Sequence, residues 1–234
     1  MARLNPTDLP RRSPLYRTLV EAGASFAPVG DGAIAEAFGK EDSAAARTLG
    51  LADLSPLPRA GWKGRGALAW LAEGGVTGLD TDNRAVPQAN GLLALRLAPT
   101  EAVLLVSFDG DTAALDGIAA GWSIDTAGLC FPVPRMESSF RFAVTGEQGA
   151  AMFAKLCAVD LRPRAFPDLA IAQTSVARMN AVVCRRDRGG VLGYEILGEW
   201  ASAEYLWACL LDAMQEFGGR PVGRAALAAL ETSG

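Results

Sequence analysis

Histidine is absent from all 234 residues of this chain, and lysine occurs only at Lys40, Lys63 and Lys155. Histidine is the only side chain that ordinarily titrates near neutral pH, so its absence excludes Ser-His-Asp and Cys-His catalysis. It also removes the commonest transition-metal ligand. Any acid–base chemistry of this chain must therefore use carboxylates, lysine, tyrosine or a bound cofactor.

Paired cysteines are also lacking, because the four cysteines are spaced by 25 to 27 residues and no C-x-x-C pair occurs. They are Cys130, Cys157, Cys184 and Cys209. We expect reduced, buried cysteines and neither a zinc site nor a redox dithiol. Asp80, Asp82 and Asn83 crowd one segment, but the glycine and terminal glutamate of a calcium loop are missing, so we interpret that segment as a turn. No metal site is predicted.

Long apolar runs and blocks of like charge are missing as well. The formal charge is −4, and no run approaches the roughly twenty apolar residues that span a bilayer. The N-terminal sequence, MARLNPTDLPRRSPLY, has no apolar signal-peptide core. We therefore expect neither a membrane nor nucleic acid as a partner, and a cytoplasmic location.

The best-defined segment is the block 193–223, GYEILGEWASAEYLWACLLDAMQEFGGRPVG. Residues 194–197 favour a strand, and Ser202 offers a side-chain oxygen as N-cap for a helix that begins at Ala203. Apolar residues recur along that helix at steps of three and four, and Gly218 offers it a left-handed exit. The block predicts an amphipathic helix packed on a sheet.

Two other segments share the order strand, glycine, helix. In the first, Gly64 and Gly66 follow a short strand and precede a helix that carries Trp70. In the second, residues 140–144 alternate like a half-buried strand, and Thr145-x-x-Gln148 forms a capping box for a helix through Leu156. The likeness indicates a weak internal repeat. The alternative stays open, because strand–turn–helix units are common in such domains.

The remaining sequence predicts antiparallel strands between these helices. Residues 91–108 favour two strands joined at Pro99 and Thr100, and residues 171–197 favour two or three strands with a hairpin at 187–190. Antiparallel strands interrupted by helices predict an α+β fold. The predicted organisation is an extended N-terminal arm over 1–14 and one α+β domain over 15–234, with repeat lobes at about 51–130 and 136–230.

Glu195 is the one candidate ligand-binding carboxylate, because it lies on a strand beside a hairpin rich in arginine. It could hold a polar heterocycle by paired hydrogen bonds, or it could belong to a solvated strand face. The arginines nearby are Arg178, Arg185, Arg186 and Arg188. They could clamp a carboxylate or phosphate, neutralise Asp187 within a solvated turn, or contact another subunit. No catalytic residue is predicted.

Three segments resemble the folate-binding aminomethyltransferase superfamily, typified by the T-protein of the glycine cleavage system. They are SPLYRTLVEAGASF, GLADLSPLPRAGWKGRGALAWL and GYEIL with the helix that follows it. The resemblance implies the T-protein core without its C-terminal barrel, which this length does not accommodate. It implies that Glu195 matches a folate-contacting glutamate, so that tetrahydrofolate is a candidate cofactor.

Other family positions differ in this chain. Residues 74–76 read Gly-Gly-Val where the family has an aspartate that assists transfer to folate, and Leu227 and Glu231 stand nearest to its C-terminal arginines. A short chain without these groups resembles the gamma subunit of heterotetrameric sarcosine oxidase, in which Glu195 would be a relic of a folate site.

That resemblance implies an accessory, non-catalytic subunit of an oxidoreductase complex. The complex would demethylate an N-methyl amino acid and pass the one-carbon unit to tetrahydrofolate. FAD, FMN and NAD would be bound by the partner alpha, beta and delta subunits. Two alternatives remain: a free-standing tetrahydrofolate-binding protein or aminomethyltransferase that uses Glu195, and a scaffold without a ligand and with an unrelated partner.

Overall fold

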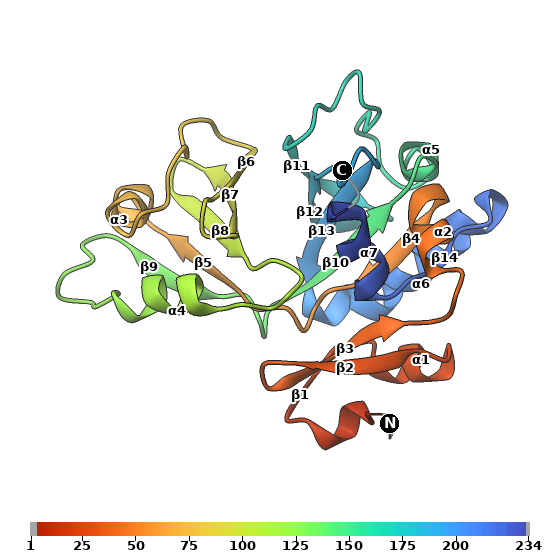
Figure 1. The fold of residues 1–234 in the computed structure, drawn as a ribbon. Coiled ribbons are helices and arrows are strands. Elements are labelled where there is room, and N and C mark those ends of the chain that lie inside the picture. Colours follow the sequence, from red (N-terminus) through yellow and green to blue (C-terminus); the bar gives the residue numbers. More distant parts are fainter. Residues whose placement is uncertain (1–3, 233–234) are drawn as a thin grey trace.

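The computed structural model describes residues 4–232, which form helices and mostly antiparallel strands in three open sheets (Figure 1). This confirms the predicted α+β fold class, and none of the sheets in the described part closes into a barrel. The helices are α1 (Tyr16–Glu21), α2 (Asp42–Thr48), α3 (Ala67–Glu73), α4 (Ala113–Ala120), α5 (Gly149–Phe153), α6 (Ala203–Met214) and α7 (Arg224–Glu231), with 3-10 turns at Pro6–Asp8, Trp200–Ser202 and Gln215–Phe217.

The strands fall into three sheets. The small sheet, in the order β1-β3-β2, contains β1 (Arg11–Arg12), β2 (Ser25–Val29) and β3 (Gly32–Ala37). The first large sheet, β6-β7-β8-β5-β9, contains β5 (Arg59–Lys63), β6 (Arg84–Pro87), β7 (Leu93–Ala98), β8 (Glu101–Leu105) and β9 (Phe131–Pro134). The second, β11-β12-β13-β10-β4-β14, contains β4 (Gly50–Asp53), β10 (Ser139–Thr145), β11 (Ile171–Val176), β12 (Met179–Arg185), β13 (Gly193–Glu199) and β14 (Arg220–Pro221).

The two large sheets define two lobes that face each other. One hydrophobic cluster joins α3 and α4 to the outer face of the first sheet, and another joins α5 and α6 to the outer face of the second. A third, smaller cluster lies between the sheets and includes Leu95, Leu105 and Leu197. The layer order is therefore helix, sheet, sheet, helix, and the polar side chains beside this third cluster lie between the two sheets.

In each lobe one strand leads through a glycine into a helix. Strand β5 is followed by Gly64 at φ 131°, and β10 is followed by Gly146 at φ 110°. A Cβ on Gly64 would lie 2.0 Å from the carbonyl oxygen of Leu129, and one on Gly146 would lie 2.4 Å from that of Thr48. Both positions therefore require glycine, because the turn packs directly against another backbone segment.

The block 193–223 folds largely as predicted. Strand β13 is followed by α6, which begins at Ala203, and Gly218 ends the helical segment with φ 67°. The predicted side-chain cap is wrong: Ser202 makes no cap hydrogen bond, because the 3-10 turn before it already leads into the helix. The pair β7 and β8, joined at Pro99 and Thr100, is confirmed.

Several local predictions were wrong. Strand β10 is buried on both faces rather than half-buried, because helices cover one side and the first lobe covers the other. The capping box at Thr145 and Gln148 does not form, and the helix ends at Phe153 rather than Leu156. Residues 25–37, for which the sequence indicated no element, form the hairpin β2–β3.

The described part of the N-terminal segment is integrated into the fold. Residues 1–3 lie outside the described range. Strand β1 pairs in parallel with β3, and the Arg11 amide donates to the Asp31 carbonyl at 3.1 Å. Residues 11–12 are therefore part of a sheet rather than of a free extended arm.

Candidate functional site

Glu195 lies in the middle of β13, on the face that points toward the other lobe. Its neighbours across the sheet are Ala143 on β10 and Cys184 on β12, whereas Tyr194 and Ile196 point into the core beneath α5 and α6. The Glu195 side chain has 0% exposure. The solvated strand face considered from the sequence is therefore excluded, and a fully buried carboxylate needs partners.

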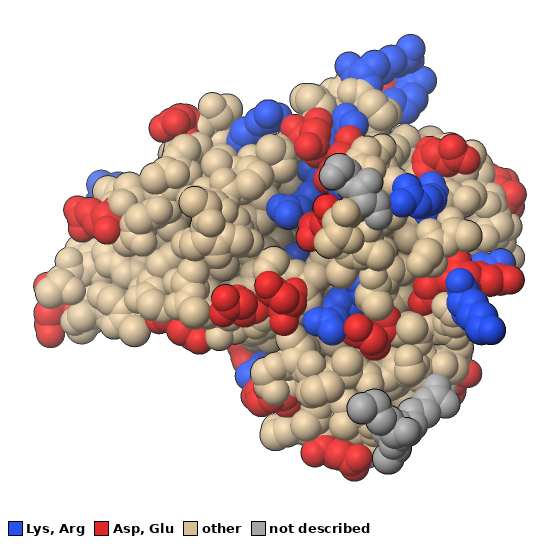
Figure 2. All heavy atoms as spheres, in the orientation of Figure 1, with Lys and Arg blue, Asp and Glu red and all other residues tan. Residues whose placement is uncertain are grey.

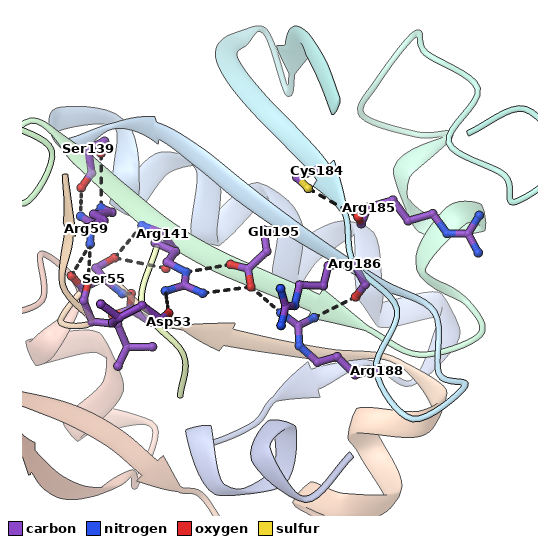
Figure 3. A network of polar contacts seen from close by, with 12 residues as sticks. Asp53, Ser55, Arg59, Ser139, Arg141, Cys184, Arg185, Arg186, Arg188 and Glu195 are labelled. Carbon is purple, nitrogen blue, oxygen red and sulfur yellow. Dashed lines mark hydrogen bonds and ion pairs between the residues drawn. The ribbon is translucent and has the colours of Figure 1, made fainter. Parts of the chain in front are cut away.

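Arg141, on the adjacent strand β10, is the principal partner of Glu195 (Figure 3). Its Nε donates to Glu195 Oε2 at 2.8 Å and its Nη2 donates to Oε1 at 3.1 Å, so that the guanidinium and the carboxylate meet edge to edge. The remaining Nη1 donates to the carbonyl of Val106 in the other lobe at 2.9 Å. Arg141 is itself only 3% exposed, so the pair is bidentate and buried.

Arg188 approaches the same carboxylate from the opposite side. Its Nη2 donates to Glu195 Oε1, and its Nη1 donates to the Arg186 carbonyl at 3.0 Å. The guanidinium stacks on the ring of Phe108, 4.9 Å from the centroid. Both oxygens of Glu195 are thus engaged by arginines of this chain.

A second carboxylate, Glu231 at the end of α7, faces the outer side of these arginines. Its Oε1 lies 3.4 Å from Arg186 Nη2 and 3.6 Å from Arg188 Nε. Glu231 is partly exposed, whereas Arg188 is buried. Figure 2 shows basic and acidic side chains next to each other on the surface between the two lobes. Helix α7 therefore closes the network from the solvent side.

The polar network continues inward from Arg141 toward the small sheet. The Arg141 amide donates to Ser55 Oγ at 3.1 Å, and the Ser55 amide donates to Asp53 Oδ1 at 3.0 Å. Arg59 donates to the Ser55 carbonyl at 2.8 Å and to the carbonyl of Ser139. Three buried arginines and two buried carboxylates thus lie in a single row between the lobes (Figure 3).

The electrostatic state of the network follows from burial and pairing. Burial raises the pKa of Glu195, but the charges of Arg141 and Arg188 outweigh that effect and lower it to about 2. Burial lowers the pKa of Arg188, and it lowers that of Arg59 to about 9. Asp53 has a raised pKa because burial is only partly offset by hydrogen bonds from Ser13 and Ser55. Glu195 is therefore a permanently ionised group at neutral pH, held by two cations.

These residues do not fit a pterin ring at Glu195. A heterocycle would need the carboxylate edge that Arg141 occupies. The cavity beside the network is also too small for a ring, because the centre of a water molecule can occupy only about 10 Å³ of it. That volume is roughly what one water requires. The arrangement neutralises buried charge and links β10 and β13 of one lobe to Val106 and Phe108 of the other.

The four arginines singled out in the sequence have separate environments. Arg185 pairs with Asp187 through Nε at 3.0 Å and donates to the Phe166 carbonyl at 2.7 Å, which matches the self-neutralising turn. Arg186 and Arg188 contact Glu231, and Arg188 alone reaches Glu195. Arg178 lies exposed in the turn between β11 and β12. They do not form one anion clamp.

Sequence reasoning missed Arg141. The available signal was an arginine between Phe140 and Phe142, on the alternate face of a strand whose other face is aromatic. Elsewhere, Asp82 pairs with Arg96, consistent with a turn. Among residues 4–232 no three His, Cys, Asp or Glu side chains gather as metal ligands, and no helix is long and apolar enough to cross a bilayer.

Comparisons with known proteins agree with this fold. The aminomethyltransferase of Mycobacterium avium is 28% identical over 245 residues, covering 97% of this chain and 64% of that protein. The aminomethyltransferase of Parafrankia sp. is 30% identical over 235 residues, covering 95% and 63%. The chain thus spans less than two thirds of the length of these relatives.

Two solved structures share the fold. A chain of the heterotetrameric sarcosine oxidase of Corynebacterium sp. U-96 aligns with a TM-score of 0.67 and 21% identity, over 90% of this chain and 97% of that one. The glycine cleavage system aminomethyltransferase T of Bartonella henselae aligns with a TM-score of 0.73 and 20% identity, over 94% of this chain and 62% of that one. Residues 89–232, more than half of the chain, match the GCVT N-terminal domain family, and the chain therefore belongs to that family.

Proposed function

We propose that this chain is a non-catalytic subunit, of the gamma type, in a sarcosine-oxidase-type complex. One observation carries the proposal: the carboxylate that would hold a pterin is saturated from within by Arg141 and Arg188. Releasing it would leave buried charges unpaired, which costs several kcal/mol. Glu195 is accordingly the relic of a folate site, and its present role is to hold the two lobes together.

The sarcosine oxidase chain supports this assignment because nearly its whole length aligns with this chain. The alignment spans 97% of that chain, against 62% of the Bartonella aminomethyltransferase. In the proposed complex the alpha, beta and delta subunits carry FAD, FMN, NAD and the tetrahydrofolate that accepts the one-carbon unit. This chain contributes a rigid surface.

The second candidate is a free-standing tetrahydrofolate-binding protein or aminomethyltransferase. It is favoured by the names of the curated relatives, which are aminomethyltransferases. It requires Arg141 to leave Glu195 when folate arrives, so that the two candidates differ in a direct binding measurement.

Purification of the tagged chain from its native locus tests the proposed assembly. We expect a stable, stoichiometric complex with yellow, flavin-bearing subunits on size exclusion. A monomer free of flavoprotein partners would contradict the proposal, whether or not the isolated chain binds tetrahydrofolate.

A further inference from the structure

A shallow groove of about 820 Å³ lies where four segments meet: residues 10–17, Asp31, the turn at 136–137, and Trp200. It meets the inner end of the polar row, because Ser13 of its lining donates to Asp53, but neither Glu195 nor Arg141 nor Arg188 lines it. Its lining combines arginine, tyrosine, tryptophan, methionine and proline side chains with Ser13 and the carboxylates of Asp31 and Glu137. Arginine, tyrosine and tryptophan are enriched at the energetically dominant centres of protein interfaces.

The basic side chains of the groove differ in their pairing. Arg11 is neutralised, since it pairs with Asp31 at 3.2 Å and with Glu137 at 2.8 Å. Arg12 and Arg17 are exposed, and no carboxylate of the described residues 4–232 forms an ion pair with either. Two guanidiniums of the groove are therefore free to receive acidic groups from outside.

Tyr16 holds these two guanidiniums in place. The Arg12 Cζ lies 5.4 Å and the Arg17 Cζ 5.3 Å from the centroid of the Tyr16 ring, and Arg17 Nε donates to the Tyr16 hydroxyl at 2.9 Å. Stacking on an aromatic ring restricts long side chains before a partner arrives, which lowers the entropy lost on binding. The groove is therefore preorganised for anions.

We infer that this groove docks an acidic segment of a partner subunit, with carboxylates on Arg12 and Arg17 and an apolar side chain against Met136 and Trp200. Charge complementarity favours this occupant: Arg11 already pairs with the groove's own Asp31 and Glu137, so that Arg12 and Arg17 are left as unneutralised cations among residues 4–232. The inference rests on the proposed function, because it requires a partner subunit.

Matched charge reversals test the inference in the complex purified from the native locus. The test variant is Arg12→Glu with Arg17→Glu, and the control is Arg65→Glu with Arg164→Glu, two exposed arginines outside the groove. Each pair changes the formal charge by the same amount, from −4 to −8. We expect the dissociation constant for the remaining subunits to rise about 100-fold in the test variant and to stay within about twofold in the control.

Hydrogen exchange of the unmodified chain supplies a second readout. Amides of 15–21 and 199–203 should exchange more slowly in the complex than in the free chain. Equal affinities of the two variants, together with unchanged exchange at these residues, would overturn the groove assignment while leaving the subunit proposal intact. If no complex forms, the subunit proposal fails and this inference falls with it.

Discussion

Replacing Arg141 by alanine should destabilise the protein strongly and make it responsive to free guanidinium. The substitution removes two of the three arginine hydrogen bonds to Glu195, whose side chain has 0% exposure. Removing one partner of a buried ion pair lowers the free energy of unfolding by about 3–5 kcal/mol, because the other charge is left buried and unpaired. For a domain of this size that loss corresponds to a melting temperature lower by roughly 6–20 °C.

The space left by Arg141 would have the shape of a planar cation. Free guanidinium can donate two parallel N–H groups to Glu195 as Arg141 does, so it should bind the variant and not the unmodified chain. With a dissociation constant of about 1 mM, guanidinium chloride at about 10 mM would stabilise the variant by about 1.4 kcal/mol.

Thermal unfolding followed by circular dichroism measures both effects, with sodium chloride at the same ionic strength as the salt control. Arg162→Ala is the matched arginine control, since Arg162 pairs with Asp160 at the surface and its loss should leave the melting temperature nearly unchanged. Should Arg141→Ala not fold, Arg141→Lys keeps the charge without the bidentate geometry and should show a smaller loss and no guanidinium response.

An Arg141→Ala protein that melts like the unmodified chain would refute the reasoning. So would a variant that guanidinium stabilises no better than sodium chloride does.

Other expectations follow from single positions. The pKa of Glu195 is lowered to about 2, so its ionised form contributes stability above its ordinary pKa that is lost as pH falls from about 5 toward 2. The difference in unfolding free energy between the unmodified chain and Glu195→Gln should therefore shrink by about 3 kcal/mol over that range in urea titrations, and a constant difference would contradict the paired state. Gly223→Ala should cost about 1–3 kcal/mol, because its Cβ would lie 2.0 Å from a carbonyl oxygen of β3. Gly117→Ala, with nothing within 4 Å, should instead stabilise α4 by about 0.5–1 kcal/mol, and equal effects of the two would argue against the packing at Gly223. Ala177 and Arg178 have φ of 49° and 68°. Asn-Gly favours positive φ at both positions of a two-residue hairpin turn, so changing these residues to Asn-Gly should raise the free energy of unfolding by about 1 kcal/mol in thermal melts. A lower stability would contradict the described turn.

Local patterns in the sequence were sufficient for much of the fold. Helix α6, its left-handed exit at Gly218 and the pair β7–β8 depend on propensities and periodicity within a few residues, and these were predicted correctly. The errors lie where tertiary contact decides. Ser202 has the residue type of a cap, but the preceding 3-10 turn makes a side-chain cap unnecessary.

The candidate site was predictable only in part. Glu195 was identified from its strand, but its state depends on Arg141, which is 54 residues away in sequence and becomes its neighbour only through the pairing of β10 with β13. Burial of β10 on both faces likewise depends on the other lobe. A strand pattern cannot distinguish a carboxylate that is free to bind a ligand from one that is paired within the protein, because both have the same neighbours in sequence.

Titration of reduced tetrahydrofolate against the isolated chain, followed by tryptophan fluorescence, tests most directly the claim that Glu195 is closed by its own arginines. We predict no saturable binding up to about 1 mM ligand. Micromolar binding that is lost in Glu195→Ala would contradict that claim and favour the aminomethyltransferase alternative.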